Sequence, residues 1–357
     1  MQIDRRSFVL AATATAWAPR AAWSARSVTD SAGRVVALPD TVSKIFAAGG
    51  PASVAVYVLR PDALIGWPRA LRDEEKPYVL PAVRALPEVG LLTGRGDSVN
   101  IEALLKVAPD VVVDFGSVRP TFVSLADSVQ ARSGLPYVLI DGRLEATAAS
   151  LRLLGDMLGA SARGRALADF TDALLGNVDR IVAAIPEEKR PRVYLARGPE
   201  GLETGLKGSI NTEIIERAGG RNVAVSDDMR RGIVNVSPEQ ILLWDPDIII
   251  TWDRNFHAKL QAQSDPIWQS VRAVRAQRVH LAPTAPFGWI DRPPSLNRLI
   301  GLQWLAGLFH GDRLPFDFAR DTRAFYKQFY QVDISDADLA TLVAWADGKP
   351  PAAARGR

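Results

Sequence analysis

A segment of fourteen residues occurs twice in this chain, and the repetition constrains the fold more than any other feature. Residues 100–113 read NIEALLKVAPDVVV and residues 237–250 read SPEQILLWDPDIII, so the glutamate, one leucine and the Pro-Asp pair coincide. In each copy a capping residue, Asn100 or Ser237, begins a short helix that the proline ends before a strand of β-branched residues. A helix followed by a fully apolar strand is typical of a parallel sheet covered on both faces. Two copies therefore indicate two similar lobes.

Other apolar runs fit the same plan. The expected strands are Lys44–Ala48, Ala63–Gly66, Val111–Phe115, Tyr137–Ile140, Arg192–Ala196, Ile248–Trp252 and Arg278–Leu281. Between the halves, apolar residues recur every three or four positions from Leu167 to Ile185, which predicts one amphipathic helix of about 20 residues. The predicted fold class is α/β, with two Rossmann-like lobes that have parallel-rich sheets and are joined by one long α-helix.

The predicted organisation of the chain follows from these elements. We divide it into a first lobe (27–143), a connecting helical segment (144–186) and a second lobe (187–347), with a disordered tail at 348–357. Because one stiff helix joins the lobes, we expect only modest movement between them. Three further helices, expected to pack on the second lobe, are Leu296–Phe309, Arg320–Tyr330 and Ala337–Ala346.

Residues 1–24 are predicted to be an export signal. Arg5-Arg6, a polar residue and Phe8 precede a short apolar stretch, an order that is typical of a twin-arginine signal peptide. The apolar stretch is shorter than the roughly 20 residues that span a membrane. With cleavage after Ser24, and with no cysteine to accept a lipid anchor, the mature chain is expected to be soluble in the periplasm.

The composition excludes several kinds of site. The 357 residues include no cysteine, which excludes disulfides and thiolate metal ligands. Only three histidines are present and no two are close in sequence, so a metal site built on histidines is hard to assemble. We expect neither a metal site nor a cofactor. The 43 basic and 40 acidic side chains are mixed along the chain, which argues against nucleic acid as a partner.

The order and spacing of several motifs give the chain a resemblance to a known family. The motifs are KIFAAGG at 44–50, VNIE at 99–102, GS at 208–209, ERAGGRN at 216–222, VSPEQ at 236–240 and the two Pro-Asp pairs. From about Ser27 to Gly348 the chain resembles substrate-binding proteins of ABC importers, in the class with a single helical backbone. That class includes receptors for cobalamin, haem and ferric siderophores. The resemblance implies a monomer that delivers a small ligand to a permease dimer with its ATPase.

A second stretch narrows the resemblance. PFGWIDRPPS at 286–295 is similar to a subgroup described loosely as receptors for metal complexes. Some relatives in the class take molybdate or tungstate.

Glu102 and Glu239 hold equivalent positions in the first turns of the two repeated helices. A carboxylate there interacts favourably with the helix dipole, and that effect alone could account for both residues. The resemblance implies a further role, because in such receptors one surface glutamate per lobe docks onto arginines of the permease dimer. A pair related by a pseudo-twofold axis suits a partner made of two identical subunits.

The ligand is expected in a cleft between the lobes, because open α/β sheets bind ligands beyond the carboxyl ends of their strands. The loops there combine glycine or serine before a helix with arginine beside an aromatic residue, a chemistry that suits an anion with apolar surface. Each residue also has an ordinary interpretation, as a core tryptophan, a solvated arginine or a tight turn. The candidates are Gly50, Ser53, Trp67, Arg69, Arg95, Ser117, Arg197, Ser209, Trp252, Arg254, Phe287, Trp289 and Arg292.

These residues predict an anionic ligand, and the main hypothesis is a metal complex such as a ferric siderophore-like chelate. A molybdate or tungstate oxyanion, haem and cobalamin are the alternatives. A ligand sensor outside transport would keep the fold without needing the paired glutamates, and a receptor for a bare divalent cation would lack the histidines it needs. The sequence contains no nucleophile elbow, no phosphate-binding loop, no two-histidine zinc helix and no dinucleotide fingerprint. We therefore do not expect an enzyme.

Overall fold

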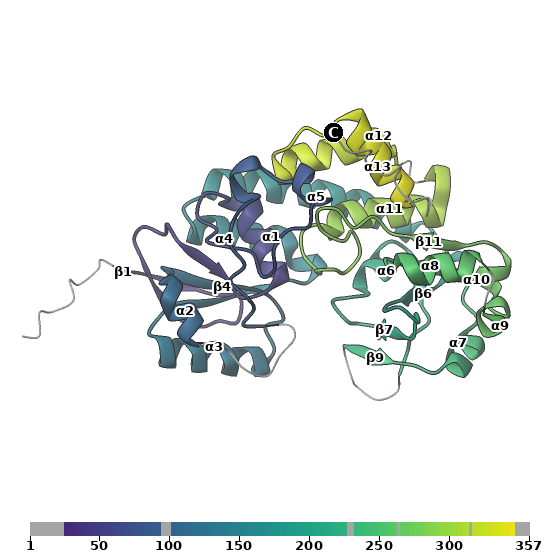
Figure 1. The fold of residues 1–357 in the computed structure, drawn as a ribbon, viewed down its shortest axis with the longest axis horizontal. Coiled ribbons are helices and arrows are strands. Elements are labelled where there is room, and N and C mark those ends of the chain that lie inside the picture. Colours follow the sequence, from purple (N-terminus) through teal and green to yellow (C-terminus); the bar gives the residue numbers. More distant parts are fainter. Residues whose placement is uncertain (1–24, 94–100, 227–231, 263–264, 314–315, 347–357) are drawn as a thin grey trace, which may run out of the picture.

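The computed structural model describes residues 25–93, 101–226, 232–262, 265–313 and 316–346. Two lobes lie side by side, with helices running along one side of both (Figure 1). The predicted signal peptide and tail lie outside the described residues. Within the described part of the chain, no helix combines the length and apolar character that crossing a membrane requires.

The first lobe is built on a parallel sheet of three strands in the order β3-β4-β5. The strands are β3 (Ile45–Ala47), β4 (Val111–Gly116) and β5 (Tyr137–Asp141), and Ile45 pairs with Val111 while Val112 pairs with Tyr137. Their side chains are buried on both faces, as the continuous apolar runs predict. The covering helices are α1 (Gly50–Leu59), α2 (Ile101–Val107) and α3 (Pro120–Ser133), and an antiparallel hairpin comprises β1 (Ala25–Thr29) and β2 (Val35–Pro39).

The second lobe repeats this plan with four parallel strands in the order β11-β10-β6-β8. The strands are β6 (Arg192–Ala196), β8 (Arg221–Asn222), β10 (Ile248–Thr251) and β11 (Val279–Leu281). A small antiparallel pair, β7 (Glu203–Gly205) and β9 (Ile233–Asn235), lies beside them. The helices are α6 (Glu213–Arg217), α7 (Pro238–Trp244), α8 (Arg254–Gln261), α9 (Pro266–Gln269) and α10 (Arg272–Arg275).

The two copies of the repeat have the same local geometry. Helices α2 and α7 are each followed by a residue with positive φ, Ala108 at 44° and Asp245 at 35°. The repeated aspartates then make the same bridge to the neighbouring strand. The amide of Asp110 donates to Lys44 O and that of Asp247 to Arg192 O, both at 2.8 Å. Their carboxylates accept from the amides of Lys44 and Arg192, both at 2.9 Å.

The predicted connecting helix is confirmed as α5 (Ser161–Ala183), which at 1.5 Å per residue is about 34 Å long. It packs closely against α4 (Thr147–Met157). A Cβ on Gly155 would lie 2.9 Å from the Cα of Gly164, and one on Gly164 would lie 2.6 Å from Leu151 O. The helices therefore approach at a point where only glycine fits.

The expected strand Ala63–Gly66 is wrong. Within this segment only Leu64 pairs with the sheet, through an isolated bridge to Ile45. The residues after Leu64 do not continue the pairing. Residues 87–89 pass close to Gly66 there, since a Cβ on it would lie 2.6 Å from Pro87 O. The amide and carbonyl of Trp67 instead bond to Pro87 and Val89.

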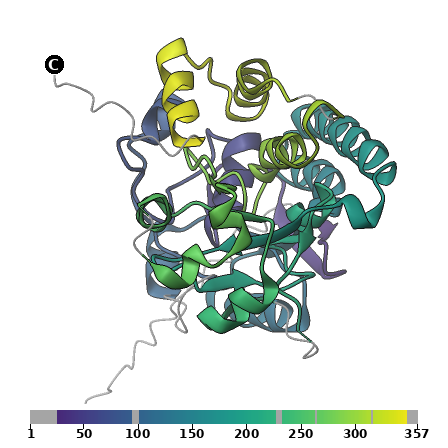
Figure 2. The same ribbon diagram turned by 90° about the vertical axis from the view of Figure 1, so that its right-hand side faces the viewer.

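The C-terminal helices were expected on the second lobe alone, and the structure corrects this. The hydroxyl of Tyr57 in α1 donates to Tyr330 O, and that of Tyr78 donates to Asp338 O at 3.0 Å. These helices therefore lie across both lobes (Figures 1 and 2). They are α11 (Arg298–His310), α12 (Phe318–Phe325), which continues as a π-helical turn (Tyr326–Tyr330), and α13 (Asp336–Ala346).

One apolar core runs without interruption through both lobes, from Val113 and Ile140 in the first to Val193 and Ile250 in the second. Each lobe also has a smaller core of its own on the outer face of its sheet. Turns of 3-10 helix complete the fold at Lys76–Tyr78, Pro81–Val83, Leu144–Ala146, Glu187–Lys189 and Gly311–Arg313.

Candidate functional site

A cavity of about 500 Å³ lies between the two lobes. On the second-lobe side, Trp252 follows β10 directly and the loop 284–293 follows β11, so these walls stand at the carboxyl ends of strands as predicted. The first-lobe wall is the loop 69–75. The lining residues are Arg69, Arg72, Glu74, Glu75, Trp252, Asp253, Arg254, Asn255, Thr284, Pro286, Phe287, Arg292 and Pro293.

One buried carboxylate organises the first-lobe wall. Glu75 is fully buried and accepts from Arg69 Nη2 at 2.6 Å and from Arg72 Nε at 3.0 Å. Burial by itself would raise the pKa of Glu75, but the hydrogen bonds from Arg69 and from the Arg72 amide outweigh it and hold that pKa below its ordinary value. Glu75 is therefore ionised, and it fixes two arginines at the rim of the cleft.

A second buried carboxylate organises the opposite wall. Asp291 accepts from Trp252 Nε1 at 2.8 Å, and its Oδ2 lies 2.8 Å from Arg197 Nε. Asn211 Nδ2 lies 3.4 Å from the same oxygen. Burial raises the pKa of Asp291, and Arg197 opposes that shift. These bonds fix the indole of Trp252 at the cleft.

Arg292 and Arg254 bring positive charge to the second-lobe wall. The guanidinium of Arg292 stands 4.4 Å from the centre of the Trp252 ring, a cation–π arrangement. Arg254 begins α8, which Asp253 caps by accepting from the Phe256 amide at 2.9 Å. Burial lowers the pKa of Arg254, while the charge of Glu74 on the facing wall opposes this. The two walls are close enough here to act on one ligand.

The structure brings five of the predicted ligand residues to this cavity: Arg69, Trp252, Arg254, Phe287 and Arg292. Arg197 lies directly behind the wall, 5.8 Å from the centre of the Trp252 ring. Arg95 falls outside the described residues. Gly50 packs against the cleft loop, since a Cβ on it would be 3.1 Å from Pro293 Cβ.

Two predicted tryptophans belong to the core and not to the cavity. Trp67 is buried, and its Nε1 donates to Val83 O at 2.8 Å. Trp289 is buried and stacks on Phe318, with ring centres 5.6 Å apart. An indole ring can pack in the core or line a ligand cavity, because most of its surface is apolar. The rings of Trp67 and Trp289 both pack in the core.

The three predicted serines have partners within their own segments. Ser53 Oγ donates to Gly50 O at 2.8 Å inside α1. Ser209 Oγ accepts from the Asn211 amide at 3.2 Å. Ser117 Oγ accepts from Arg119 Nε at 3.1 Å. None of the three lines the described cavity.

Sequence reasoning missed Arg72, Glu74 and Glu75, which share the first-lobe wall with Arg69. Their spacing was a usable signal, because Arg69, Arg72 and Glu75 follow one another at intervals of three in a loop that a predicted strand precedes. The role of Asp291 was also missed, although it lies beside the predicted Arg292.

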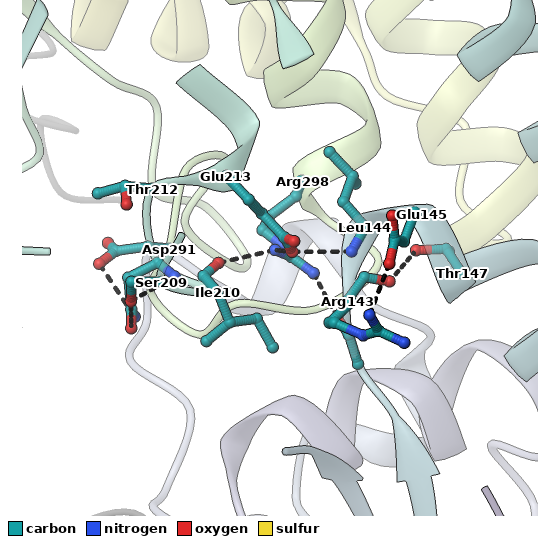
Figure 3. Close-up of polar contacts among 12 residues, drawn as sticks. Arg143, Leu144, Glu145, Thr147, Ser209, Ile210, Thr212, Glu213, Asp291 and Arg298 are labelled. Atoms are coloured by element: carbon teal, nitrogen blue, oxygen red, sulfur yellow. Dashed lines mark hydrogen bonds and ion pairs between the residues drawn. The ribbon is translucent and has the colours of Figure 1, made fainter. Parts of the chain in front are cut away.

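A buried ion pair joins the lobes behind the cleft (Figure 3). Arg298 is fully buried and bonds to Glu213 Oε1 at 2.5 Å and to Ile210 O at 2.8 Å, both in the second lobe. It also donates to Gly142 O at 2.5 Å, just after β5 of the first lobe. Glu213 accepts in turn from the Leu144 amide at 2.7 Å. Burial lowers the pKa of Arg298, and Glu213 opposes this shift.

No group of three or more histidine, aspartate or glutamate side chains that could hold a metal ion occurs among the residues the structure describes. His257 lies in α8, with Nε2 3.3 Å from Val279 O, and burial lowers its pKa. Burial also lowers the pKa of His280, to about 4.

The helices of the predicted docking glutamates lie on the side of the molecule away from α11–α13 (Figure 1). Glu102 in α2 and Glu239 in α7 are both exposed and both stand in the first helical turn. The pKa of Glu239 is lowered by its own backbone amide and by the side chain of Ser237. Ser237 caps α7 by accepting from the Gln240 amide at 3.2 Å, as predicted, whereas Asn100 lies outside the described residues.

Residues 35–286 match the periplasmic binding protein family, and because this is most of the chain, the protein belongs to that family. It is a substrate-binding protein of the ABC-importer type, a class that binds a small ligand and interacts with a permease. The solved structures described next confirm the two-lobe α/β fold that the sequence predicts.

Three similar proteins span most of the chain. An ABC transporter solute binding protein from Sulfurospirillum deleyianum is 30% identical with a TM-score of 0.80, covering 89% of this chain and 98% of that one. The molybdate-binding protein MolA of Haemophilus influenzae is 26% identical over 88% of this chain and 93% of its own. Its molybdate-bound structure superimposes with a TM-score of 0.70 at 23% identity, over 87% and 99% of the two chains. A periplasmic solute binding protein from Veillonella parvula is 25% identical with a TM-score of 0.69, over 89% and 96%.

Proposed function

We propose that this protein is a receptor that an export signal in residues 1–24 directs to the periplasm, where it captures an anionic metal complex and delivers it to an ABC permease. The observation that carries the proposal is the pairing of arginines with aromatic surface in one cleft: Arg292 stacked on Trp252, with Phe287 and Arg254 beside them. Arginines bind the carboxylate or catecholate oxygens of a chelator, and the aromatic rings cover its apolar edges.

The size of the cleft favours a chelate over a small oxyanion. At about 500 Å³ the cavity falls within the range of small-molecule sites, roughly 300–1,000 Å³. A tetrahedral oxyanion is only a few times larger than a water molecule, whose share of liquid volume is about 30 Å³. An oxyanion would therefore leave most of this space filled with water.

A molybdate or tungstate oxyanion is the second candidate. The observation that favours it is the similarity to the molybdate-binding protein of Haemophilus influenzae over nearly the full length of both chains. The four arginines of the cleft would supply its hydrogen-bond donors.

A ligand panel separates the two candidates. The purified protein is titrated by calorimetry and thermal shift with a ferric tricatecholate, ferric citrate, haem, cyanocobalamin, molybdate and tungstate. We expect a ferric chelate to raise the melting temperature most, since a ligand at 100 times its Kd adds about 2.7 kcal/mol of stability. A response to molybdate and tungstate alone would establish the second candidate, and no response to any anionic probe would refute the proposed ligand class.

Substitution of Arg292 by glutamine is expected to weaken binding of the responding ligand about tenfold or more, because a charge-assisted bond and the cation–π contact with Trp252 are lost together. The matched control is Arg152→Gln, an arginine of α4 that pairs with Asp169 and Asp172 on the surface. Calorimetric Kd values for both variants provide the measurement. Equal affinities for the two variants would place the ligand away from this wall.

Glu102 and Glu239 are proposed to dock the receptor onto the permease dimer, one glutamate to each subunit. Their exposure on equivalent helices of the two lobes supports this role.

A further inference from the structure

The repeat contains two identities outside the core: a glutamate, for which the helix dipole is a sufficient account, and a leucine, which the fold does not explain. Four positions are identical between residues 100–113 and 237–250: the glutamate, one leucine, the proline and the aspartate. The proline follows the residue with positive φ at which each helix ends, and the aspartate bridges to the adjacent strand. The glutamate and the leucine are exposed, so neither contributes to the core.

The shared leucines are Leu105, 48% exposed, and Leu242, 38% exposed. The residue before each of them is buried: Leu104 in α2 and Ile241 in α7. The two helices thus have the same inward face, and the same leucine lies outside it in both. A single exposed leucine is ordinary on a protein surface, but the same exposed leucine on both halves of a diverged repeat points to a contact that the two lobes share.

Each leucine lies next to the glutamate of its own helix. Glu102 precedes Leu105 by three residues and Glu239 precedes Leu242 by three, which places each pair on one helix face about one turn apart. Each lobe therefore presents a carboxylate and an apolar side chain together, and the pair occurs once per lobe.

We infer that Leu105 and Leu242 are the apolar anchors of a two-point docking surface whose partner is the permease dimer. The inference rests on the proposed function and adds to the glutamates the part of the contact that excludes water. A surface repeated about a pseudo-twofold axis matches a partner that is itself twofold, one lobe to each subunit. An ion pair between exposed groups contributes little alone, whereas an adjacent apolar contact buries area and shields the charges.

The test measures docking directly. The protein loaded with ferric tricatecholate binds the permease–ATPase complex in lipid nanodiscs, and biolayer interferometry gives the Kd for wild type, Leu105→Ser, Leu242→Ser and the double variant. Each single change is expected to weaken docking about tenfold and the double change about a hundredfold, as loss of a half-exposed leucine from an interface implies. Val35→Ser is the matched control, because Val35 is 71% exposed and belongs to β2, not to α2 or α7.

Two controls keep the result interpretable. Ligand Kd and melting temperature should not change in any leucine variant, which excludes unfolding as the cause. The inference is overturned if the double leucine variant docks like wild type. A loss of docking in Glu102→Lys/Glu239→Lys would then show that docking uses the charges alone. The inference is also overturned if wild type forms a dimer in solution that the leucine variants abolish without changing docking. Failure of ligand binding in wild type would instead contradict the proposed ligand.

Discussion

Replacing Arg298 with methionine is expected to lower the free energy of unfolding by about 3 kcal/mol, because it leaves the carboxylate of Glu213 without its buried partner. The change also removes the donors to Gly142 O and Ile210 O, one in each lobe. Buried acceptors that lose their donors carry the full desolvation penalty. Urea denaturation followed by tryptophan fluorescence provides the measurement.

A double-mutant cycle tests the origin of this loss. Adding Glu213→Gln to Arg298→Met removes the orphaned charge and should recover part of the stability, which gives a coupling energy between the two sites. Arg152→Met serves as the surface control and is expected to change stability by less than about 0.5 kcal/mol. A loss in Arg298→Met no larger than in the control would mean that the pair does not hold the lobes together.

Reversing both repeated glutamates, in the variant Glu102→Lys/Glu239→Lys, is expected to abolish transport and leave ligand affinity unchanged. Both side chains are exposed and stand on α2 and α7, outside the cleft. Like charges facing the arginines of a permease would repel where opposite charges attract. Ligand-stimulated ATPase activity and uptake in proteoliposomes measure transport, and calorimetry measures affinity.

The control for this variant has the same change in charge at other exposed acids, Asp40→Lys/Glu188→Lys, one in each lobe. Equal loss of transport in both variants would show a general effect of net charge. If only ligand affinity fell in the glutamate variant, the docking role would be wrong and these residues would act on the site. Normal transport would favour a purely structural role at the helix N-termini.

The repeat and the continuous apolar runs were sufficient to predict six of the seven strands of the two parallel sheets; the two-residue strand β8 was missed, and Ala63–Gly66 was predicted in error. Strand Arg192–Ala196 has the predicted bounds, and β4, β5 and β10 differ from theirs by a single residue. Those runs are rich in β-branched and aromatic residues, which favour a buried strand. The pair β7 and β9 escaped prediction because β7 reads Glu-Thr-Gly and β9 reads Ile-Val-Asn, and neither forms the continuous apolar run by which the buried strands were recognised.

The cleft could be predicted only in part, because sequence places a residue on a loop without giving the direction of its side chain. Trp252 ends one predicted strand and Trp289 lies in the loop after another, yet Asp291 directs the first to the cleft and Phe318 draws the second into the core. The partners that decide between these outcomes are 39 and 29 residues away in the chain. The lobe contacted by the C-terminal helices depends in the same way on distant partners, Tyr57 and Tyr78.

The helices that lie across both lobes give the halves a second attachment beside α5. Rings from the two lobes interlock there: Tyr57 lies 6.3 Å from Phe287 and Phe287 lies 5.5 Å from Tyr330, measured between ring centres. Two attachments in parallel resist torsion as well as bending, and wide opening would have to separate this aromatic packing. A permease that must recognise a loaded receptor would accordingly detect small rearrangements of the side chains at the mouth of the cleft, more than any gross change of shape.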